Sequence, residues 1–371
     1  NNATLIQQNL PVYDRQQVLP VGDQNQGIIG LGQFPFKQIY PQSGWVEHNP
    51  VEIWQTTLKA AKAAIKSAKI NSDEIASLAI TNQRETTLIW DRESGRPVYN
   101  AIVWQCRRTS RFCDKLTNKG YGKIIKNATG LIVDPYFSGS KFNWILNNVT
   151  GAKARARKGE LLCGTIDTYL LWRLSNKKSH KTDVSNASRT QLMNIAKVGW
   201  DEDLLKIFAV PENILPEICP SNEIFGVTEG IKYLPDGIPI SGIAGDQQAA
   251  LFGQACFNAG EAKCTFGTGS FLLMNTGSKI VTSSSGLLTT VAWQLCGQRS
   301  LTYALEGGAY ICGAAVQWLR DELQIINSSK EIEKMAKTVT GSAGVEFVPA
   351  MVGLAAPYWD PNARGAIVGI T

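Results

Sequence analysis

The stretch that most constrains the fold of this chain runs from Gly242 to Phe271, where a strand, a turn, a helix and a second strand follow one another. An apolar strand comes first, and Gly245-Asp246 ends it before an expected helix over 249–256. A second strand over 262–265 then opens into a turn rich in glycine. Open α/β sheets bind ligands where strands end and helices begin, so this stretch predicts a ligand site.

Two features of the stretch suggest chemistry. Asp246 follows the first strand, and Gly267-Thr268-Gly269 follows the second, where glycine lets backbone N–H groups approach an anion closely. A carboxylate and an anion-binding turn about twenty residues apart, on adjacent strands, indicate phosphoryl transfer. Each feature has a commoner alternative, because an Asp before a helix is often only an N-cap and Gly-Thr-Gly is often only a turn.

Length and composition limit the class of protein. A chain of 371 residues predicts two domains, and 44% hydrophobic with 18% charged residues is typical of a globular protein. The sequence has no run of eighteen apolar residues, so it predicts no membrane-spanning helix. The N-terminus shows no secretory signal pattern. The net charge of +6 is mild, and the basic turns lack the interleaved aromatic residues of a nucleic-acid surface.

Cysteine and histidine usage narrows the chemistry further. The eight cysteines show no Cys-x-x-Cys spacing, which favours reduced thiols in the cytoplasm over disulfides or zinc. Only two histidines occur, which argues against a histidine-based triad or metal site. We therefore expect any general base to be a carboxylate.

From about residue 25 onward, strands alternate with helices, which predicts an α/β fold. Residues 1–24 show no sustained alternation, and we expect them to form an aberrant or disordered segment outside the fold. Asn49 is the expected N-cap of a helix that begins at Pro50. Further strands are predicted over 28–32, 75–80, 86–90, 101–104, 161–165, 287–292 and 301–305, and further helices over 167–174 and 311–323.

Several blocks, in order along the chain, resemble the FGGY family of carbohydrate kinases. The blocks are Pro41–His48, Thr81–Thr87, Val103–Arg108, Asp134–Gly139, Ser241–Gly253, Phe266–Gly277 and Pro357–Asp360. The resemblance covers roughly Asp23 to Thr371 and implies the actin-like, ribonuclease H-like ATPase fold, with two lobes around a cleft. It implies a polyol-binding lobe over 25–253 and an incomplete nucleotide-binding lobe over 254–371.

Within that family, the chain is similar to the transferases that phosphorylate glycerol to glycerol 3-phosphate with ATP and Mg²⁺. Carried over residue by residue, the resemblance implies that glycerol is bound by Arg84, Glu85, Trp104, Tyr136, Asp246, Gln247 and Phe271. It implies nucleotide contacts from Gly267, Thr268, Gly269, Gly313 and Gln317. Asp246 is the implied general base and a candidate Mg²⁺ ligand.

The chemistry of a triol agrees with this set of residues. Arg84 can donate hydrogen bonds to the hydroxyl groups, and Glu85 and Asp246 can accept hydrogen bonds from them. Trp104 and Phe271 can cover the C–H face. Without the resemblance, a surface ion pair for Arg84-Glu85 and ordinary core packing for the aromatic residues would be preferred. No G-x-x-x-x-G-K-[ST] motif occurs, so the chain does not resemble a P-loop enzyme.

The chain departs from the family pattern at both ends. The family begins with Asp-x-Gly-Thr-Thr-Ser-x-Arg, whose Asp helps to hold Mg²⁺ and whose turn wraps the ATP phosphates. Residues 10–20 contain no such turn, so Asp14 cannot take that role, and the chain stops at Thr371 inside the second lobe. We therefore expect impaired catalysis. The alternatives are a non-catalytic remnant that binds a polyol or a protein partner, and a related sugar or polyol kinase; homo-oligomerisation stays open.

Overall fold

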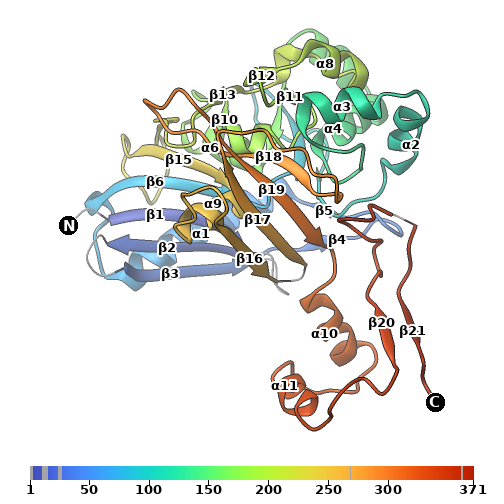
Figure 1. The fold of residues 1–371 in the computed structure, drawn as a ribbon. Coiled ribbons are helices and arrows are strands. Elements are labelled where there is room, and N and C mark those ends of the chain that lie inside the picture. The colour runs from blue at the N-terminus through green and yellow to red at the C-terminus, as the bar shows by residue number, and fades with distance from the viewer. Residues whose placement is uncertain (1–2, 11–15, 24–26, 268, 361) are drawn as a thin grey trace.

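The computed structural model describes residues 3–10, 16–23, 27–267, 269–360 and 362–371. In these ranges the strands form a six-stranded, a five-stranded and a four-stranded sheet, together with three two-stranded ribbons (Figure 1). Also within these ranges, no helix has the length and the apolar content that crossing a membrane requires.

The six-stranded sheet has three parallel strands at its centre. Strands β15, β6 and β1 run parallel, whereas β14, β2 and β3 are each antiparallel to a neighbour. Its order is β14 (Gly226–Val227), β15 (Pro239–Gly245), β6 (Ile75–Asn82), β1 (Ala3–Leu10), β2 (Gln16–Asp23) and β3 (Gly27–Pro35). Residues of this sheet form one hydrophobic core with helices α1 (Pro50–Ala68) and α6 (Ile166–Leu174).

The expectation that residues 1–24 lie outside the fold is wrong for the described part of that segment. Strand β1 pairs with β6, and β2 pairs with both β1 and β3. Leu19 and Val21 are buried in the same core as α1, within a short apolar run that does not alternate. Pairing with neighbouring strands, rather than local pattern, decides this segment. Asp14 lies outside the described residues.

Helix α1 begins where the sequence predicts and lies close against β3. The Asn49 side chain accepts a hydrogen bond from the Val51 N–H at 2.9 Å, and Pro50 is the first helical residue. Gly30 and Gly32 of β3 face Ala60 and Ala64 of the helix with almost no space between the backbones. Glycine at these positions permits the close packing of helix on sheet.

We predict that Gly32→Ala lowers the free energy of unfolding by about 1–3 kcal/mol, because overpacking forces the backbones apart. A Cβ at Gly32 would lie 1.9 Å from the Ala60 carbonyl oxygen. Gly122→Ala is the matched control, since a Cβ there meets no atom within 4 Å. Urea-induced unfolding measures both variants, and equal stability of Gly32→Ala and the unchanged protein contradicts the packing account.

The five-stranded sheet supports the second hydrophobic core. Its order is β4 (Gln38–Ile39), β5 (Glu47–His48), β8 (Ala101–Ile102), β7 (Thr87–Asp91) and β9 (Leu161–Thr165). The surrounding helices are α2 (Ser110–Asn118), α3 (Gly122–Thr129), α4 (Ser138–Asn148), α5 (Ala152–Arg157) and α8 (Glu202–Phe208). Trp104, Tyr136 and Phe271 belong to this core, although Phe271 comes from the four-stranded sheet. The second core therefore joins the two halves of the chain.

The four-stranded sheet is antiparallel throughout, and helix α9 (Asp246–Gly253) leads into it from β15. Its order is β16 (Ala262–Phe266), β17 (Ser270–Gly277), β19 (Thr302–Ala309) and β18 (Leu288–Trp293). The remaining α-helices are α7 (Val184–Ala187), α10 (Gly313–Asp321) and α11 (Glu331–Ala336), and two short 3-10 helices cover Ser72–Glu74 and Glu212–Ile214. The two-stranded ribbons pair β10 (Lys181–Asp183) with β13 (Glu217–Cys219), β11 (Met193–Asn194) with β12 (Gly199–Trp200), and β20 (Glu346–Val348) with β21 (Ala366–Val368).

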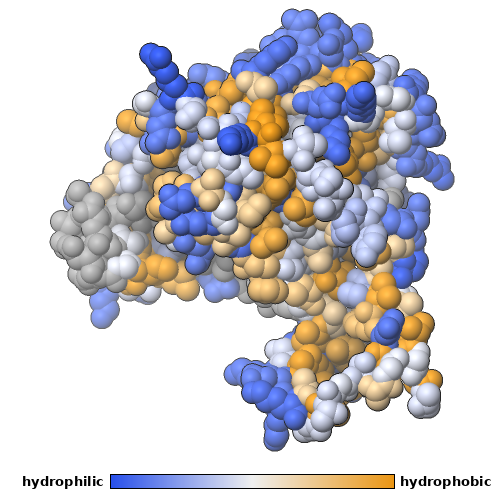
Figure 2. All heavy atoms as spheres, viewed as in Figure 1, coloured by the Kyte–Doolittle hydropathy of each residue, from blue (hydrophilic) through white to orange (hydrophobic). Residues whose placement is uncertain are grey.

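Elements α10, α11, β20 and β21 project from the rest of the molecule (Figure 1). Apolar side chains of this segment reach the surface, among them Val348 and Val368 (Figure 2).

Elsewhere the predicted elements agree with the structure within a few residues, with two differences. Helix α9 begins at Asp246 itself rather than at 249, and β19 extends to Ala309 because Gly307 and Gly308 continue its pairing with β17.

Candidate active site

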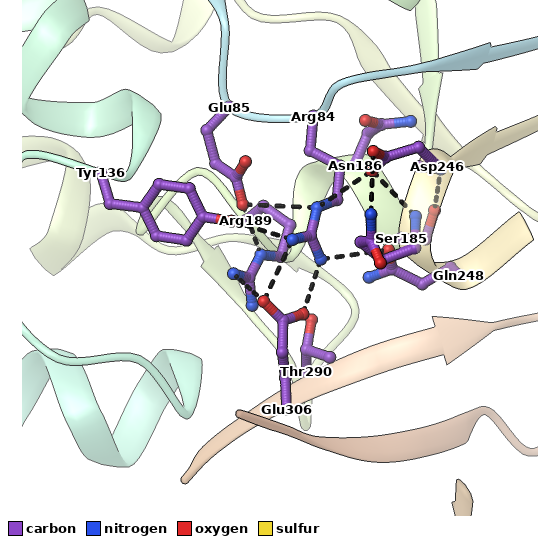
Figure 3. Close-up of polar contacts among 12 residues, drawn as sticks. Arg84, Glu85, Tyr136, Ser185, Asn186, Arg189, Asp246, Gln248, Thr290 and Glu306 are labelled. Atoms are coloured by element: carbon purple, nitrogen blue, oxygen red, sulfur yellow. Dashed lines mark hydrogen bonds and ion pairs between the residues drawn. The ribbon is translucent and has the colours of Figure 1, made fainter. Parts of the chain in front are cut away.

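Parallel strands bring the central residues of the site together. Gly245, the last residue of β15, pairs with Asn82, the last residue of β6. Asp246 and Arg84 follow these two strand ends, and Arg84 Nε lies 3.5 Å from Asp246 Oδ1 (Figure 3). The sequence prediction that Asp246 follows a strand is confirmed, but Gly245 rather than Asp246 is the N-cap of α9.

Arg84 is held by protein partners on both ends of its guanidinium. Its Nη1 donates to Glu306 Oε2 at 2.6 Å and its Nη2 donates to Glu306 Oε1 at 3.0 Å. Nη2 also donates to the Tyr136 hydroxyl at 2.9 Å, and Nη1 lies 3.4 Å from Gln248 Oε1. The Arg84 side chain is only 2% exposed. Such paired, charge-assisted hydrogen bonds fix the guanidinium plane.

A second arginine closes a ring of buried ion pairs. Arg189, which follows α7, donates from Nε to Glu85 Oε1 at 2.7 Å and from Nη2 to Glu306 Oε1 at 2.9 Å (Figure 3). Arg84 Nε lies 3.6 Å from Glu85 Oε1, so two arginines and two glutamates alternate around the ring. All four side chains are at most 3% exposed. The surface ion pair considered for Arg84-Glu85 is therefore wrong.

The backbone conformation at Arg84 and the glycine at 245 make room for the arginine side chain. Arg84 has φ of +59°, a left-handed conformation that costs a non-glycine residue energy. A Cβ at Gly245 would lie 2.7 Å from Arg84 Cγ, so glycine at 245 leaves room for the arginine stem. Lys141 Nζ donates to the backbone carbonyls of Glu85, at 3.1 Å, and Tyr136, at 2.5 Å. These contacts hold the turn that carries Arg84 and Glu85.

The two carboxylates that flank Arg84 differ in their protonation chemistry. Burial acts to raise the pKa of Glu306, but the charges of Arg189 and Arg84 outweigh it and hold that pKa at about 2. Burial raises the pKa of Asp246, and the charge of Arg84 offsets this effect only in part. Glu306 therefore stays ionised at neutral pH and well below it, whereas Asp246 is the carboxylate better suited to accept a proton.

Three aromatic side chains gather beside the ion-pair ring. The Trp104 ring lies edge-on to Tyr136 at 5.8 Å and to Phe271 at 6.0 Å between centroids. The Arg84 guanidinium lies 6.0 Å from the Phe271 ring centroid. The structure therefore brings Trp104, Tyr136 and Phe271 next to the polar side chains, with Gln247 following Asp246 on α9. Together they give one apolar side and one charged side.

The polar side of the site retains unused hydrogen-bonding capacity. Among the residues that the structure describes, Arg84 Nε and Glu85 Oε2 are buried without a hydrogen-bond partner. Buried polar atoms are nearly always satisfied, so each such atom needs an explanation. One unused donor and one unused acceptor on adjacent residues match a hydroxyl group, which both donates and accepts.

The glycine turn after β16 is tied to the start of α10. Gly267 N–H donates to the Gly269 carbonyl, and Gly313 N–H donates to the Gly267 carbonyl, both at 2.8 Å. A Cβ at Gly269 would lie 2.6 Å from a neighbouring backbone oxygen, so the turn requires glycine there. The structure thus groups Gly267, Gly269 and Gly313, with Gln317 further along α10. Thr268 lies outside the described residues.

Sequence reasoning missed three charged residues of the site: Arg189, Lys263 and Glu306. Lys263 Nζ donates to Gln247 Oε1 and, at 2.9 Å, to Thr265 Oγ1. Glu306 and Lys263 both interrupt apolar strand patterns, and that interruption is a signal that could have identified them. Arg189 lies in a polar stretch and has no comparable signal.

The described residues contain no group of three or more histidine, cysteine, aspartate or glutamate side chains arranged to hold a metal ion. A Mg²⁺ ion that binds with nucleotide phosphates needs only one or two protein carboxylates. Asp246, with a 16% exposed side chain, is a carboxylate of the right chemistry for such an ion.

The fold places the chain in the class of two-domain kinases with the actin-like ATPase fold. The description "FGGY family of carbohydrate kinases, N-terminal domain" matches residues 19–253, and the corresponding C-terminal domain matches residues 262–371. The chain belongs to the FGGY family of carbohydrate kinases.

Similar proteins in this family act on small polyols and sugars, as their names state. Glycerol kinase from Bdellovibrio bacteriovorus is 59% identical over 345 residues, which cover 93% of this chain and 70% of that protein. Glycerol kinase from Thermoanaerobacter sp. is 56% identical over 349 residues, covering 94% and 70%. The crystal structure of Plasmodium falciparum glycerol kinase with ADP superposes with a TM-score of 0.87 at 37% identity, covering 100% of this chain and 73% of that one. Xylulose kinase from Lactobacillus acidophilus, at 21% identity, TM-score 0.82 and coverage of 99% and 73%, shares the fold.

We predict that Glu306→Gln lowers the free energy of unfolding at neutral pH by about 3–5 kcal/mol, because Arg84 and Arg189 then lose their shared anion. The pKa of Glu306 is about 2 in the folded protein, below its ordinary value of 4.5. Its stabilising charge is therefore fully present above pH 4.5 and is lost as the pH falls through about 2. The stability gap between the unchanged protein and the variant should narrow over that range.

Denaturant unfolding at a series of pH values measures this gap. Glu202→Gln is the control, because Glu202 pairs with Lys206 on an exposed helix surface and should matter little. A gap that is small at neutral pH, or that widens on acidification, contradicts the role given to Glu306.

Proposed function

We propose that this site phosphorylates glycerol with ATP to give glycerol 3-phosphate and ADP. The observation that carries the proposal is that two buried atoms beside Asp246, Arg84 Nε and Glu85 Oε2, make no hydrogen bond to any described residue. Aromatic side chains lie next to them. Relatives named glycerol kinase, at 56–59% identity over more than nine tenths of the chain, support it. They do not favour a non-catalytic remnant or a kinase for another sugar.

Glycerol has the chemistry that the two sides of the site require. A hydroxyl can accept from Arg84 Nε and donate to Glu85 Oε2, and a terminal hydroxyl can donate to Asp246. Trp104 and Phe271 can cover the C–H face of the three-carbon chain. Rejection of molecules without these hydroxyls follows, because they would leave buried polar atoms unpaired.

In the proposed reaction, the terminal hydroxyl oxygen of glycerol attacks the γ-phosphorus of ATP. Its bond to phosphorus forms as the bond from the γ-phosphorus to the bridging oxygen breaks, and ADP leaves. Asp246 accepts the hydroxyl proton. General-base catalysis of this kind raises the rate by about 10²–10⁴-fold. Arg84, held by Glu306, positions both the hydroxyl group and the Asp246 carboxylate.

The nucleotide is expected at the glycine turn. The turn of Gly267, Thr268 and Gly269 would approach the phosphates, and Gly313 and Gln317 would contact the rest of the nucleotide. Asp246 is the residue proposed to reach a Mg²⁺ ion, which supplies charge neutralisation for the phosphates when bound. Turnover is expected to be slow because residues 10–20 lack a Gly-Thr-Thr-Ser turn.

All eight cysteines are free of disulfide bonds, which supports a cytoplasmic location.

We predict that Asp246→Asn keeps glycerol binding within a few fold and lowers ATP-dependent phosphorylation by about 10²–10⁴, because an amide cannot accept the proton. Titration calorimetry measures glycerol binding, and a coupled ADP assay measures turnover in the same preparation. The unchanged protein is the reference, and xylulose is the control ligand. Absence of glycerol binding by the unchanged protein overturns the proposed function, and an Asp246→Asn variant with full activity overturns the role of Asp246.

We predict that kcat/KM for glycerol falls on acidification at a pH above the ordinary aspartate pKa of 3.8. Burial raises the pKa of Asp246, and only the deprotonated carboxylate can act as base, so activity is present above this pKa and is lost as pH falls through it. A pH–rate profile measures the limb. A limb at or below the ordinary value would show that Asp246 is not the titrating base.

A further inference from the structure

Lys263 is a buried lysine next to the site, and its hydrogen-bond partners carry no charge. It lies on β16 with 6% exposure. Its Nζ donates to Gln247 Oε1, to Thr265 Oγ1 at 2.9 Å and to the Phe271 carbonyl at 3.4 Å. Within the described ranges, all three acceptors are neutral oxygens. A buried ammonium held in this way is costly, which suggests that its charge serves the neighbouring site.

Lys263 and Asp246 hold the Gln247 amide from its two ends. An ammonium group has donors only, so the atom of Gln247 that faces Lys263 must be the oxygen. The amide NH₂ then faces the other way and donates from Nε2 to Asp246 Oδ2 at 3.0 Å. The Gln247 backbone N–H donates to Asp246 Oδ1 at 2.8 Å. Both oxygens of the carboxylate therefore receive a hydrogen bond from Gln247.

Charged and titratable groups from three elements and from the turn after β6 act on Lys263. Burial and the charge of Arg84 lower the pKa of Lys263 to about 8, whereas Asp246 on α9, Glu306 on β19 and Cys264 on β16 act to raise it. The ammonium is thus present at neutral pH and is lost as the pH rises through about 8. A neutral amine can accept as well as donate, so above this pKa the charge of Lys263 no longer holds the Gln247 oxygen, and the hydrogen bond to Asp246 Oδ2 alone keeps the NH₂ group in place.

We propose that Lys263 is a positioning residue that orients the Gln247 amide and, through it, the Asp246 carboxylate that accepts the proton of glycerol. The proposal rests on the function proposed above. Lys263 lies in the part of the chain matched to the C-terminal domain, whereas Gln247 and Asp246 lie in the part matched to the N-terminal domain. The orientation of the base therefore depends on contact between the two domains.

A double-mutant cycle in kinetics tests the catalytic half of the proposal. Lys263→Met is expected to lower kcat by about 10- to 100-fold, with a much smaller change in KM, because the base remains but is misoriented. The acid limb of kcat/KM should move to higher pH, since the charge of Lys263 acts to lower the pKa of Asp246. Lys263→Arg, which keeps a donor-only cation, should recover part of kcat.

The cycle also compares Gln247→Met with the double variant. If Lys263 acts through Gln247, the double variant is no slower than Gln247→Met alone. Additive losses, or an unmoved acid limb in Lys263→Met, overturn the proposal. Thermal unfolding of each variant accompanies the kinetics, because a purely structural lysine would lower Tm without a selective loss of kcat.

An NMR titration tests the orientation step without any need for turnover. In protein labelled with ¹⁵N-glutamine, the side-chain NH₂ signals of Gln247 are assigned by their loss in Gln247→Met. They should shift between pH 7 and 9 with a midpoint near the Lys263 pKa of about 8, and show no such step in Lys263→Met. No step in the unchanged protein overturns the proposal. A clear step in a protein that binds no glycerol keeps the Lys263–Gln247 contact but removes the proposed function.

Discussion

The paired hydrogen bonds between Arg84 and Glu306 are the interaction on which the site depends. They join the turn after β6 to strand β19, which lie 222 residues apart in sequence. Buried charges are stable only when each has its partners in place, so Arg189 and Glu85 are required as much as the central pair. The ring therefore fixes how the two parts of the chain meet.

This constraint gives three carboxylates at one site different chemistry. Glu306 receives hydrogen bonds from two arginines and keeps its charge far below neutral pH. Glu85 accepts a hydrogen bond from Arg189 through Oε1, and its Oε2 makes no hydrogen bond to any described residue. Asp246 is next to Arg84 at a longer distance, and burial raises its pKa. Environment rather than residue type separates the structural anion from the base.

Prediction from the sequence succeeded where the decisive contacts are local. Asn49 caps α1 through N–H groups two and three residues away, and Asp246 follows β15 as its apolar run indicated. Several residues implied by the family resemblance lie close together, including Arg84 with Asp246 and Trp104 with Phe271. Prediction failed for β1 and β2, for Arg189 and for Glu306, because strand pairing and side chains distant in sequence determine them.

The sequence by itself determined the α/β class, the approximate positions of several helices and strands, and the presence of a carboxylate at the end of a buried strand. Those properties follow from periodicity and capping within a few residues of the chain. Only the tertiary structure decided that Glu306 stays ionised, that Lys263 faces Gln247, and that Arg84 Nε and Glu85 Oε2 make no hydrogen bond to any described residue. Burial and opposite charge set these properties, and both arise only when distant segments pack together.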